Sequence, residues 1–218
     1  MRKDCDLLVV GAHLPEIAAL KPFLSTPKGH RVVETTVGIG LSAAAVGTTW
    51  GIAAALPRAV IFVGTCGAYA GERALRIGEL AIARTVKLVA AGAIDGLAAF
   101  PGPMELSLES DPSMRDGLVA AGGATPADVA TTLAVTTDDA LAARICAATS
   151  CAVEHLEAHA VATACNAAGV PFAAVLGVAN HVGSCGRAEW QANHQASSDA
   201  AVAHLIAWLE KGAPGLSV

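Results

Sequence analysis

The sequence predicts an α/β fold: a single-domain three-layer sandwich over residues 1–218, with a mixed, mostly parallel central sheet flanked by helices. Two observations lead to this prediction. Short apolar runs alternate with Ala-rich stretches of helical length, at about 30 to 40 residues per pair, which is typical of parallel strands covered on both faces. In addition, 218 residues are enough to bury a sizeable core within one domain.

The predicted strands are short runs that are apolar throughout or alternate with polar residues, and turn residues bound them. The run 6–11, Asp-Leu-Leu-Val-Val-Gly, has the composition of a strand buried on both faces. The run 59–63 leads directly into Gly64–Tyr69, where two glycines would let a flat ligand lie against bare backbone. The predicted strands are 6–11, 31–37, 59–63, 77–83, 131–136 and 172–179.

The predicted helices follow these strands and carry start or stop signals. Pro15 is acceptable in a first helical turn, Thr137 and Asp138 form a cap region, and Gly169 ends a helix. The Gly- and Pro-rich segment 90–125 is expected to be mostly loop, and a segment this long often covers an active site. The predicted helices are 14–24, 42–56, 113–121, 138–148, 161–168 and 197–209.

Composition excludes several classes of protein. The net charge is −5 with no basic stripe, which argues against a nucleic-acid groove. No apolar run reaches the roughly 18 uncharged residues of a membrane span, and Asp4 and Asp6 ahead of the first apolar run argue against a signal peptide. The six scattered cysteines are expected to be buried residues or free thiols in a reducing compartment. We therefore expect a cytoplasmic protein that binds neither nucleic acid nor membrane.

Two carboxylates, Glu154 and Glu157, lie where an apolar run changes into a helical pattern. A charge is costly to bury unless something binds it, so Glu157 is predicted to accept hydrogen bonds from ligand hydroxyls. The alternative is that these acids only favour a helix N-terminus. Glu16 has the same two interpretations. It stands just past the first strand, and open α/β sheets bind ligands at the carboxyl ends of their strands.

Taken in order, these stretches resemble the nucleoside phosphorylase and nucleosidase superfamily, and the resemblance covers most of the chain. Within it the chain is most similar to the futalosine hydrolases, which release hypoxanthine from futalosine on a route to menaquinone. Nucleosidases for methylthioadenosine or S-adenosylhomocysteine carry Asp where this chain has Asn180. The motifs behind the resemblance are the first strand with Glu16, 37–40, 64–69, 77–79, 154–160, and 180–183 followed by Arg187 and Trp190 in a polar connection.

The resemblance implies hydrolysis of the N-glycosidic bond of a small-molecule purine nucleoside without a cofactor, with Glu16 as the general base for water and Glu157 bound to the ribose. Asn180 is also predicted from its own chemistry. Its amide offers a donor and an acceptor, which match O6 and a protonated N7 of a 6-oxopurine, whereas a protonated Asp would match adenine better. The alternative is an Asn that caps a turn. The other expected substrate-binding residues are Leu156, Cys66, Gly67, Tyr69, Gly38 and His181.

Several of these residues have alternative roles. Cys66 has no base beside it in sequence and is expected to be a buried thiol, while Tyr69 either walls the pocket or packs. His181 either touches the ligand or has a surface role. His155 and His159 are spaced for a metal on one helix face, but no third ligand is evident, so no metal is expected.

Water is the expected nucleophile, because the loop 38–44 carries no Arg or Lys to hold phosphate. The chain departs from the family at Leu176 and Ala179, where relatives tend to carry Arg and Ser, and at His159, where a small residue is usual. These changes either retune the pocket or mark a chain that cleaves poorly. Two other functions therefore stay open: a methylthioadenosine/S-adenosylhomocysteine nucleosidase, or a non-catalytic nucleoside-binding homologue. The resemblance also implies a homodimer or a higher homo-oligomer.

Overall fold

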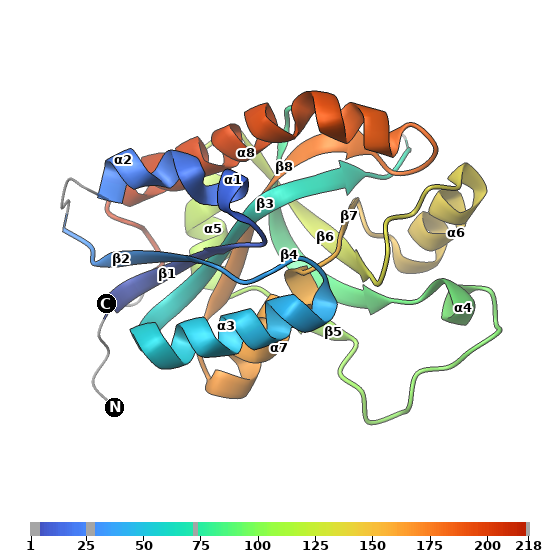
Figure 1. Cartoon of the computed structure of the whole chain (residues 1–218), viewed down its shortest axis with the longest axis horizontal. Coiled ribbons are helices and arrows are strands. Elements are labelled where there is room, and N and C mark those ends of the chain that lie inside the picture. Colours follow the sequence, from blue (N-terminus) through green and yellow to red (C-terminus); the bar gives the residue numbers. More distant parts are fainter. Residues whose placement is uncertain (1–4, 25–28, 72–73, 217–218) are drawn as a thin grey trace.

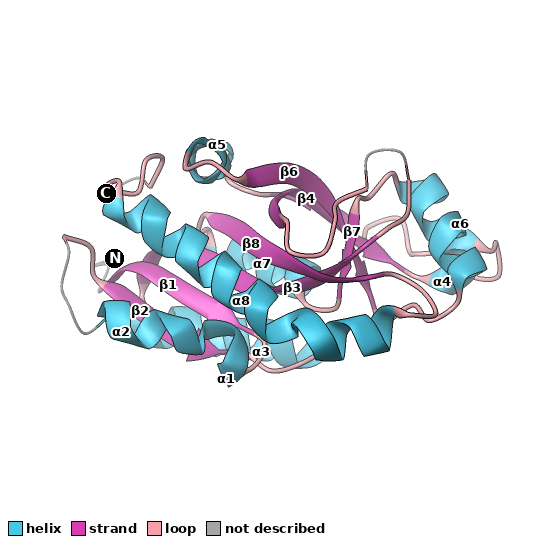
Figure 2. Cartoon of the chain, turned by 90° about the horizontal axis from the view of Figure 1, so that it is seen from above, coloured by secondary structure: helices cyan, strands magenta, loops and turns pink. Residues whose placement is uncertain are grey.

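The computed structural model describes residues 5–24, 29–71 and 74–216. Met1–Asp4, which bear on the expectation of no signal peptide, lie outside them. The chain forms an α/β domain in which helices cover a central sheet (Figures 1 and 2). The strands are β1 (Cys5–Gly11), β2 (Val32–Thr36), β3 (Pro57–Ala68), β4 (Leu80–Val89), β5 (Ser107–Glu109), β6 (Ala124–Thr132), β7 (Val153–His155) and β8 (Phe172–His181).

The helices pack on both sides of this sheet. In Figure 1, α8, α1 and α2 lie above it and α3 and α7 lie below it. The helices are α1 (Leu14–Ile17), the 3₁₀ turn η1 (Ala18–Leu20), α2 (Lys21–Leu24), α3 (Leu41–Ala55), α4 (Ala91–Ile94), α5 (Pro112–Ala120), α6 (Asp139–Thr149), α7 (Ala158–Ala168) and α8 (Gly186–Glu210). No helix in the described ranges is both long and apolar enough to cross a bilayer.

The sheet is mixed, as predicted, but it is not the flat middle layer of a sandwich. The strand order is β2-β1-β3-β7-β6-β4-β5, and β8 pairs with both β3 and β4. β8 runs parallel to β3 and antiparallel to β4, so β3, β7, β6, β4 and β8 close into a barrel-like ring. The three-layer prediction is wrong on this point, because apolar runs show which segments are strands but not which edges meet.

The side chains of β1 contribute to two separate hydrophobic clusters, one on each face of the strand. Leu8 and Val10 belong to one buried cluster, and Leu7 and Val9 belong to another. Alternate side chains of a strand point to opposite faces, so β1 is buried on both faces, as its continuous apolar run predicts.

Several predicted elements have different bounds in the structure, and three of the differences matter most. The strand expected at 131–136 is β6, Ala124–Thr132. It begins and ends earlier than predicted, and its first residues belong to the segment 90–125 that is predicted to be mostly loop. The helix expected at 14–24 is broken into α1, η1 and α2, because Pro22 has no N–H to continue the helical hydrogen bonds. The last helix, α8, begins at Gly186 instead of 197, so the predicted polar connection is largely helical.

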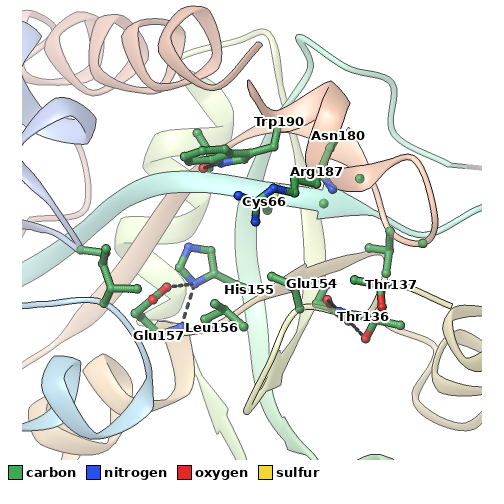
Figure 3. A pocket seen from close by; sticks show the side chains of 18 of the residues that line it. Cys66, Thr136, Thr137, Glu154, His155, Leu156, Glu157, Asn180, Arg187 and Trp190 are labelled. Atoms are coloured by element: carbon green, nitrogen blue, oxygen red, sulfur yellow. Dashed lines mark hydrogen bonds and ion pairs between the residues drawn. The ribbon is translucent and has the colours of Figure 1, made fainter. Parts of the chain in front are cut away.

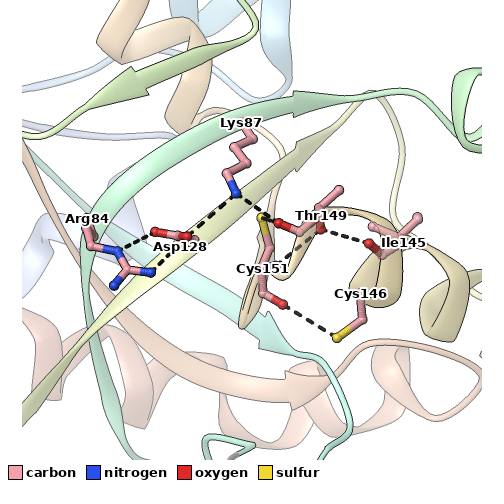
Figure 4. Close-up of polar contacts among 7 residues, drawn as sticks. All are labelled: Arg84, Lys87, Asp128, Ile145, Cys146, Thr149 and Cys151. Carbon is pink, nitrogen blue, oxygen red and sulfur yellow. Dashed lines mark hydrogen bonds and ion pairs between the residues drawn. The ribbon is translucent and has the colours of Figure 1, made fainter.

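A polar cluster joins β4, β6 and the end of α6 on the side of the barrel shown in Figure 4. Asp128 accepts two hydrogen bonds from Arg84, at 2.8 and 2.9 Å, and its other cationic neighbour is Lys87 at 3.6 Å. Lys87 in turn donates to the Thr149 carbonyl at 2.8 Å. The hydrogen bond from Arg84, more than any other contact, holds the pKa of Asp128 below its usual range.

Asp128→Asn is expected to lower the free energy of unfolding by about 1 kcal/mol at pH 7, since the pair with Arg84 is partly exposed and solvent screens it. A carboxyl with a lowered pKa stabilises the fold above its unfolded value of about 4, and that contribution is lost as pH falls through the folded value. Urea unfolding should therefore show a larger difference between the two proteins at pH 7 than at pH 3. Asp95→Asn, in the more exposed pair with Arg144, is the matched control and should have a smaller effect at pH 7.

Candidate active site

A cavity of about 370 Å³ lies at the carboxyl ends of the parallel strands β1, β3 and β8 (Figure 3). β7 crosses beneath it and contributes Glu154 and His155. α1, the loop before α3, the loop after β6 and the start of α8 supply the remaining walls. Ligands commonly bind at this edge of α/β sheets, so this cavity is the candidate site.

Glu16 enters the cavity from α1 and is 5% exposed. Its Oε2 accepts the backbone N–H groups of Ala12 at 2.7 Å and His13 at 3.3 Å. The ring Nδ1 of His13 lies 3.4 Å from the same oxygen, and hydrogen bonding to Glu16 is the main reason why the pKa of His13 is raised. Oε1 bonds to no described residue, so this oxygen is available to a ligand or a water molecule.

Glu157 caps the start of α7 and is 4% exposed. Its Oε1 accepts the N–H of Gly40 at 2.7 Å, and its Oε2 lies 3.1 Å from Nδ1 of His155. Gly38 and Gly40 have φ of +96° and +86°, a conformation that favours glycine, and this turn brings the Gly40 N–H to the carboxylate. The loop and α7 are thus joined at a charged group that faces the cavity.

Asn180 ends β8 with its amide held between two glycines. Its Nδ2 donates to the His181 carbonyl at 2.8 Å. A Cβ on Gly67 would lie 2.8 Å from this nitrogen, and one on Gly186 would lie 3.1 Å from it. The register of β3 against β8 shifts between Cys66 and Gly67, which pairs Gly67 with Asn180. One N–H and the carbonyl oxygen of the amide have no described partner, so a donor and an acceptor remain for a ligand.

Glu154 is a second buried carboxylate, but its hydrogen bonds lie within the protein. It accepts the Tyr69 hydroxyl at 2.7 Å, the Thr136 N–H at 2.9 Å and the Thr136 hydroxyl at 2.6 Å. Burial and this neighbouring carboxylate raise the pKa of Tyr69 well above its ordinary value. Tyr69 therefore packs behind Glu154 and is not among the residues of the cavity wall, which favours the packing alternative.

Two more of the predicted substrate-binding residues are absent from the cavity wall in the described structure. Gly38 donates its N–H to the Ala12 carbonyl and shapes the loop, while the neighbouring Ile39 reaches the cavity. His181 turns toward α8, where Glu189 accepts its backbone N–H at 2.7 Å and lies 3.1 Å from its Nδ1. The predicted residues that do line the cavity are Glu16, Glu157, Leu156, Cys66, Gly67 and Asn180.

Sequence reasoning assigned no site role to two residues of α8 that line the cavity, Arg187 and Trp190. Trp190 donates through Nε1 to the Thr65 hydroxyl at 3.1 Å and stacks on His194, with ring centroids 4.3 Å apart. Arg187 is exposed, and no carboxylate in the described residues pairs with it. Both lie in the first two turns of a helix that the sequence predicts to start later. Their place in the family motif is the signal that could have identified them.

The departures from the family pattern lie outside the cavity wall. Leu176 and Ala179 are fully buried. His159 faces away, with Nε2 3.0 Å from the Glu105 carbonyl, and burial lowers its pKa. His155 is in β7 and His159 is in α7, so the two do not share a helix face. Among the described residues, no three His, Cys, Asp or Glu side chains form a group that could hold a metal.

Cys66 lines the cavity but is 3% exposed, and burial raises the pKa of its thiol far above the ordinary value. A thiol nucleophile works as the thiolate. Cys66 therefore contributes packing and shape, as the sequence indicates.

Comparisons with known proteins match this description. A family model described as the phosphorylase superfamily matches residues 10–211, and a comparison with curated proteins finds no match. A futalosine hydrolase mutant of Helicobacter pylori strain 26695 has a TM-score of 0.84 at 17% identity, over 95% of this chain and 99% of that chain.

Two 5′-methylthioadenosine/S-adenosylhomocysteine nucleosidases are equally similar in structure. The protein from Neisseria meningitidis has a TM-score of 0.84 at 19% identity, over 94% of this chain and 99% of that chain. The protein from Colwellia psychrerythraea 34H has 0.84 at 18% identity, over 99% and 98%. These structures show the shared fold, and the family model covers most of the sequence. The chain therefore belongs to the phosphorylase superfamily.

Proposed function

We propose that this protein is a purine nucleosidase, an enzyme that hydrolyses the bond between a purine base and C1′ of its ribose. One observation carries the proposal: two buried carboxylates, Glu16 and Glu157, face one cavity, and the Asn180 amide lies in the same cavity. A reaction of this kind needs a base for water, acceptors for the ribose hydroxyls and a group that stabilises the departing purine.

In the proposed reaction, Glu16 acts on the attacking water and Glu157 acts on the ribose. As the C1′–N9 bond breaks, its electron pair moves to the purine and the ribose becomes oxocarbenium-like, as in other glycosyl transfers. The water oxygen bonds to C1′, and Glu16 Oε1 takes the proton that the water releases. Glu157 accepts hydrogen bonds from the ribose hydroxyls, and its negative charge favours the cationic sugar. N7 of the departing purine takes a proton from solvent water, and Glu16 later returns its own proton to solvent, so the net reaction consumes one water molecule.

The base we propose is a 6-oxopurine, with futalosine as the leading substrate. Asn180 already donates one N–H to the His181 carbonyl, so its second N–H can meet O6 while its carbonyl oxygen accepts from N7–H. The similarity to the Helicobacter pylori futalosine hydrolase supports this assignment. The second candidate is methylthioadenosine or S-adenosylhomocysteine, because similar structures bear those names and one of them contains adenine.

Incubation without phosphate and identification of the released base test this function. The substrates are futalosine, aminodeoxyfutalosine, inosine, methylthioadenosine and S-adenosylhomocysteine. Hypoxanthine from futalosine supports the first candidate, and adenine from the adenine nucleosides supports the second. Binding without release of any base would instead indicate a non-catalytic nucleoside-binding protein. Added phosphate should not accelerate release, because α8 supplies the one Arg of the described cavity wall and Lys is absent from it.

Asn180→Asp should shift preference from 6-oxopurine to 6-aminopurine nucleosides by about 10- to 100-fold, because it replaces the donor to O6 and leaves O6 mispaired in the bound complex. The ratio of kcat/KM for inosine to that for adenosine measures the shift. Asn193→Asp is the control: this amide contacts backbone carbonyls on α8 and β8 and is not part of the cavity wall. An unchanged ratio in Asn180→Asp would remove Asn180 from base recognition.

We also propose a homodimer or higher homo-oligomer in the cytoplasm. Val46 and Trp50 are one turn apart on α3 and are 58% and 73% exposed. Ile39, just before α3, is also 65% exposed and lines the cavity. Exposed apolar residues grouped in this way are typical of protein interfaces. The free cysteines agree with a reducing compartment.

A further inference from the structure

Gly64, in β3, has no side chain, and two polar atoms, Glu16 Oε1 and His155 Nε2, lie close to the space that a side chain would fill. A Cβ on Gly64 would lie 3.2 Å from Glu16 Oε1 and 3.3 Å from His155 Nε2. In the described residues the two atoms form no bond with each other and have no other hydrogen-bond partner. Both residues line the cavity, so a water molecule from the cavity could reach the gap between these atoms.

The His155 ring is held in one orientation. It extends from β7, is 5% exposed and meets the Phe62 ring edge to face, with centroids 5.0 Å apart. Both contacts of its Nδ1 are with Glu157: the backbone N–H at 3.0 Å and Oε2 at 3.1 Å. Nε2 is therefore the ring nitrogen left for the cavity, and when it carries a proton it offers an N–H to the space above Gly64, opposite a carboxylate oxygen of Glu16.

We propose that Glu16 Oε1 and His155 Nε2–H together hold the attacking water above Gly64. This proposal rests on the proposed nucleosidase function. The water donates one hydrogen to Oε1 and accepts the N–H of His155, which fixes one of its lone pairs and leaves the other for C1′. As the O–C1′ bond forms, the C1′–N9 pair leaves with the purine and the proton passes to Glu16. His155 keeps its proton and acts as a positioning residue.

The two cationic candidates in the described wall, Arg187 and His13, are not placed to do this. Arg187 stands on α8 and is exposed, and His13 contacts the opposite oxygen of Glu16. Leu176, where relatives tend to carry Arg, is buried in the core. The donor that orients the water is thus supplied by β7.

A high-resolution crystal structure tests the water site directly. The wild-type protein should show an ordered water within hydrogen-bond distance of Glu16 Oε1 and His155 Nε2. Gly64→Ala should lose this water, because its methyl group fills the gap. A wild-type structure without the water would overturn the proposal. If the water is present but no nucleoside is cleaved, the nucleosidase function fails and the water site stands.

Kinetics test what the water site does. His155→Leu should lower kcat by about 100-fold, the low end for a group that acts at the proton-transfer step, with KM changed less than about threefold. His155→Gln, which restores an N–H donor, should recover about tenfold of the loss. His159→Gln is the matched control and should keep wild-type rates. Thermal melting of each variant identifies a fold defect. Wild-type kcat in a folded His155→Leu would show that His155 does not orient the water.

Discussion

Replacing Glu16 with Gln is expected to lower kcat for base release by about 100- to 10,000-fold, the usual contribution of a positioned general base. Gln can keep an oxygen toward the N–H groups of Ala12 and His13, so the geometry of α1 should persist. What changes is the second atom, which becomes an NH₂ group that cannot take a proton from water. Affinity for the nucleoside should change little, because Glu16 is proposed to contact water and not the sugar.

The measurement is single-turnover release of the base, together with the dissociation constant of the same nucleoside from calorimetry. Glu109→Gln, an exposed position on β5, is the control and should keep full activity. If Glu16→Gln turns over at the wild-type rate, the assigned mechanism is wrong. If it also loses binding, Glu16 contacts the substrate directly.

Glu157→Ala is expected to lower kcat/KM by about 100-fold, because hydrogen bonds from hydroxyls to a charged group contribute roughly 1.5–3 kcal/mol each. A double-mutant cycle isolates this effect: the wild type and the variant are each assayed with a ribonucleoside and with its 2′-deoxy analogue. In the wild type the deoxy analogue should be the poorer substrate, and in the variant the difference should largely disappear. Equal sensitivity to the missing hydroxyl in both proteins would show that Glu157 does not bind it.

Glu157→Gln serves as the matched variant in this cycle. It keeps an oxygen for the Gly40 N–H and so preserves the junction between the loop and α7. It removes the charge and turns the oxygen near His155 Nδ1 into an NH₂ group, and its loss should be smaller than that of the Ala variant. A large additional loss in Glu157→Ala alone, equal for both substrates, would indicate that the loop has moved.

The sequence predicts the parts of this site that depend on short chain segments. Glu16 follows a strand and Glu157 starts a helix, and the structure places both at one cavity, together with Asn180. Their catalytic roles remain predictions. The side chains that turn away, such as Tyr69 and His181, could not be recognised in the same way. The direction of Tyr69 depends on Glu154, 85 residues away in the sequence. The direction of His181 depends on Glu189, which is only 8 residues away but lies on the part of α8 that the sequence predicts to be a loop.

The closure of the barrel and the early start of α8 could not be predicted from the sequence either. β8 bridges β3 and β4 through pairings that join segments about a hundred residues apart, and no local pattern encodes such a choice. At α8, the glycines 183 and 186 indicate a loop, yet Asp139 of α6 binds the backbone and hydroxyl of Ser184 and fixes the turn. A contact from a separate helix therefore decides where α8 begins.

The two glycines around Asn180 also bear on how a change of substrate could arise in such a site. Gly67 and Gly186 lie so close to the amide nitrogen that a side chain at either glycine would crowd it. Asp has the same shape as Asn, but one of its oxygens would then face the His181 carbonyl, so it fits best as the protonated acid. If Asn180 recognises the base as proposed, a lineage with this site can move between 6-oxo and 6-amino bases through this one isosteric replacement, provided that both glycines are kept.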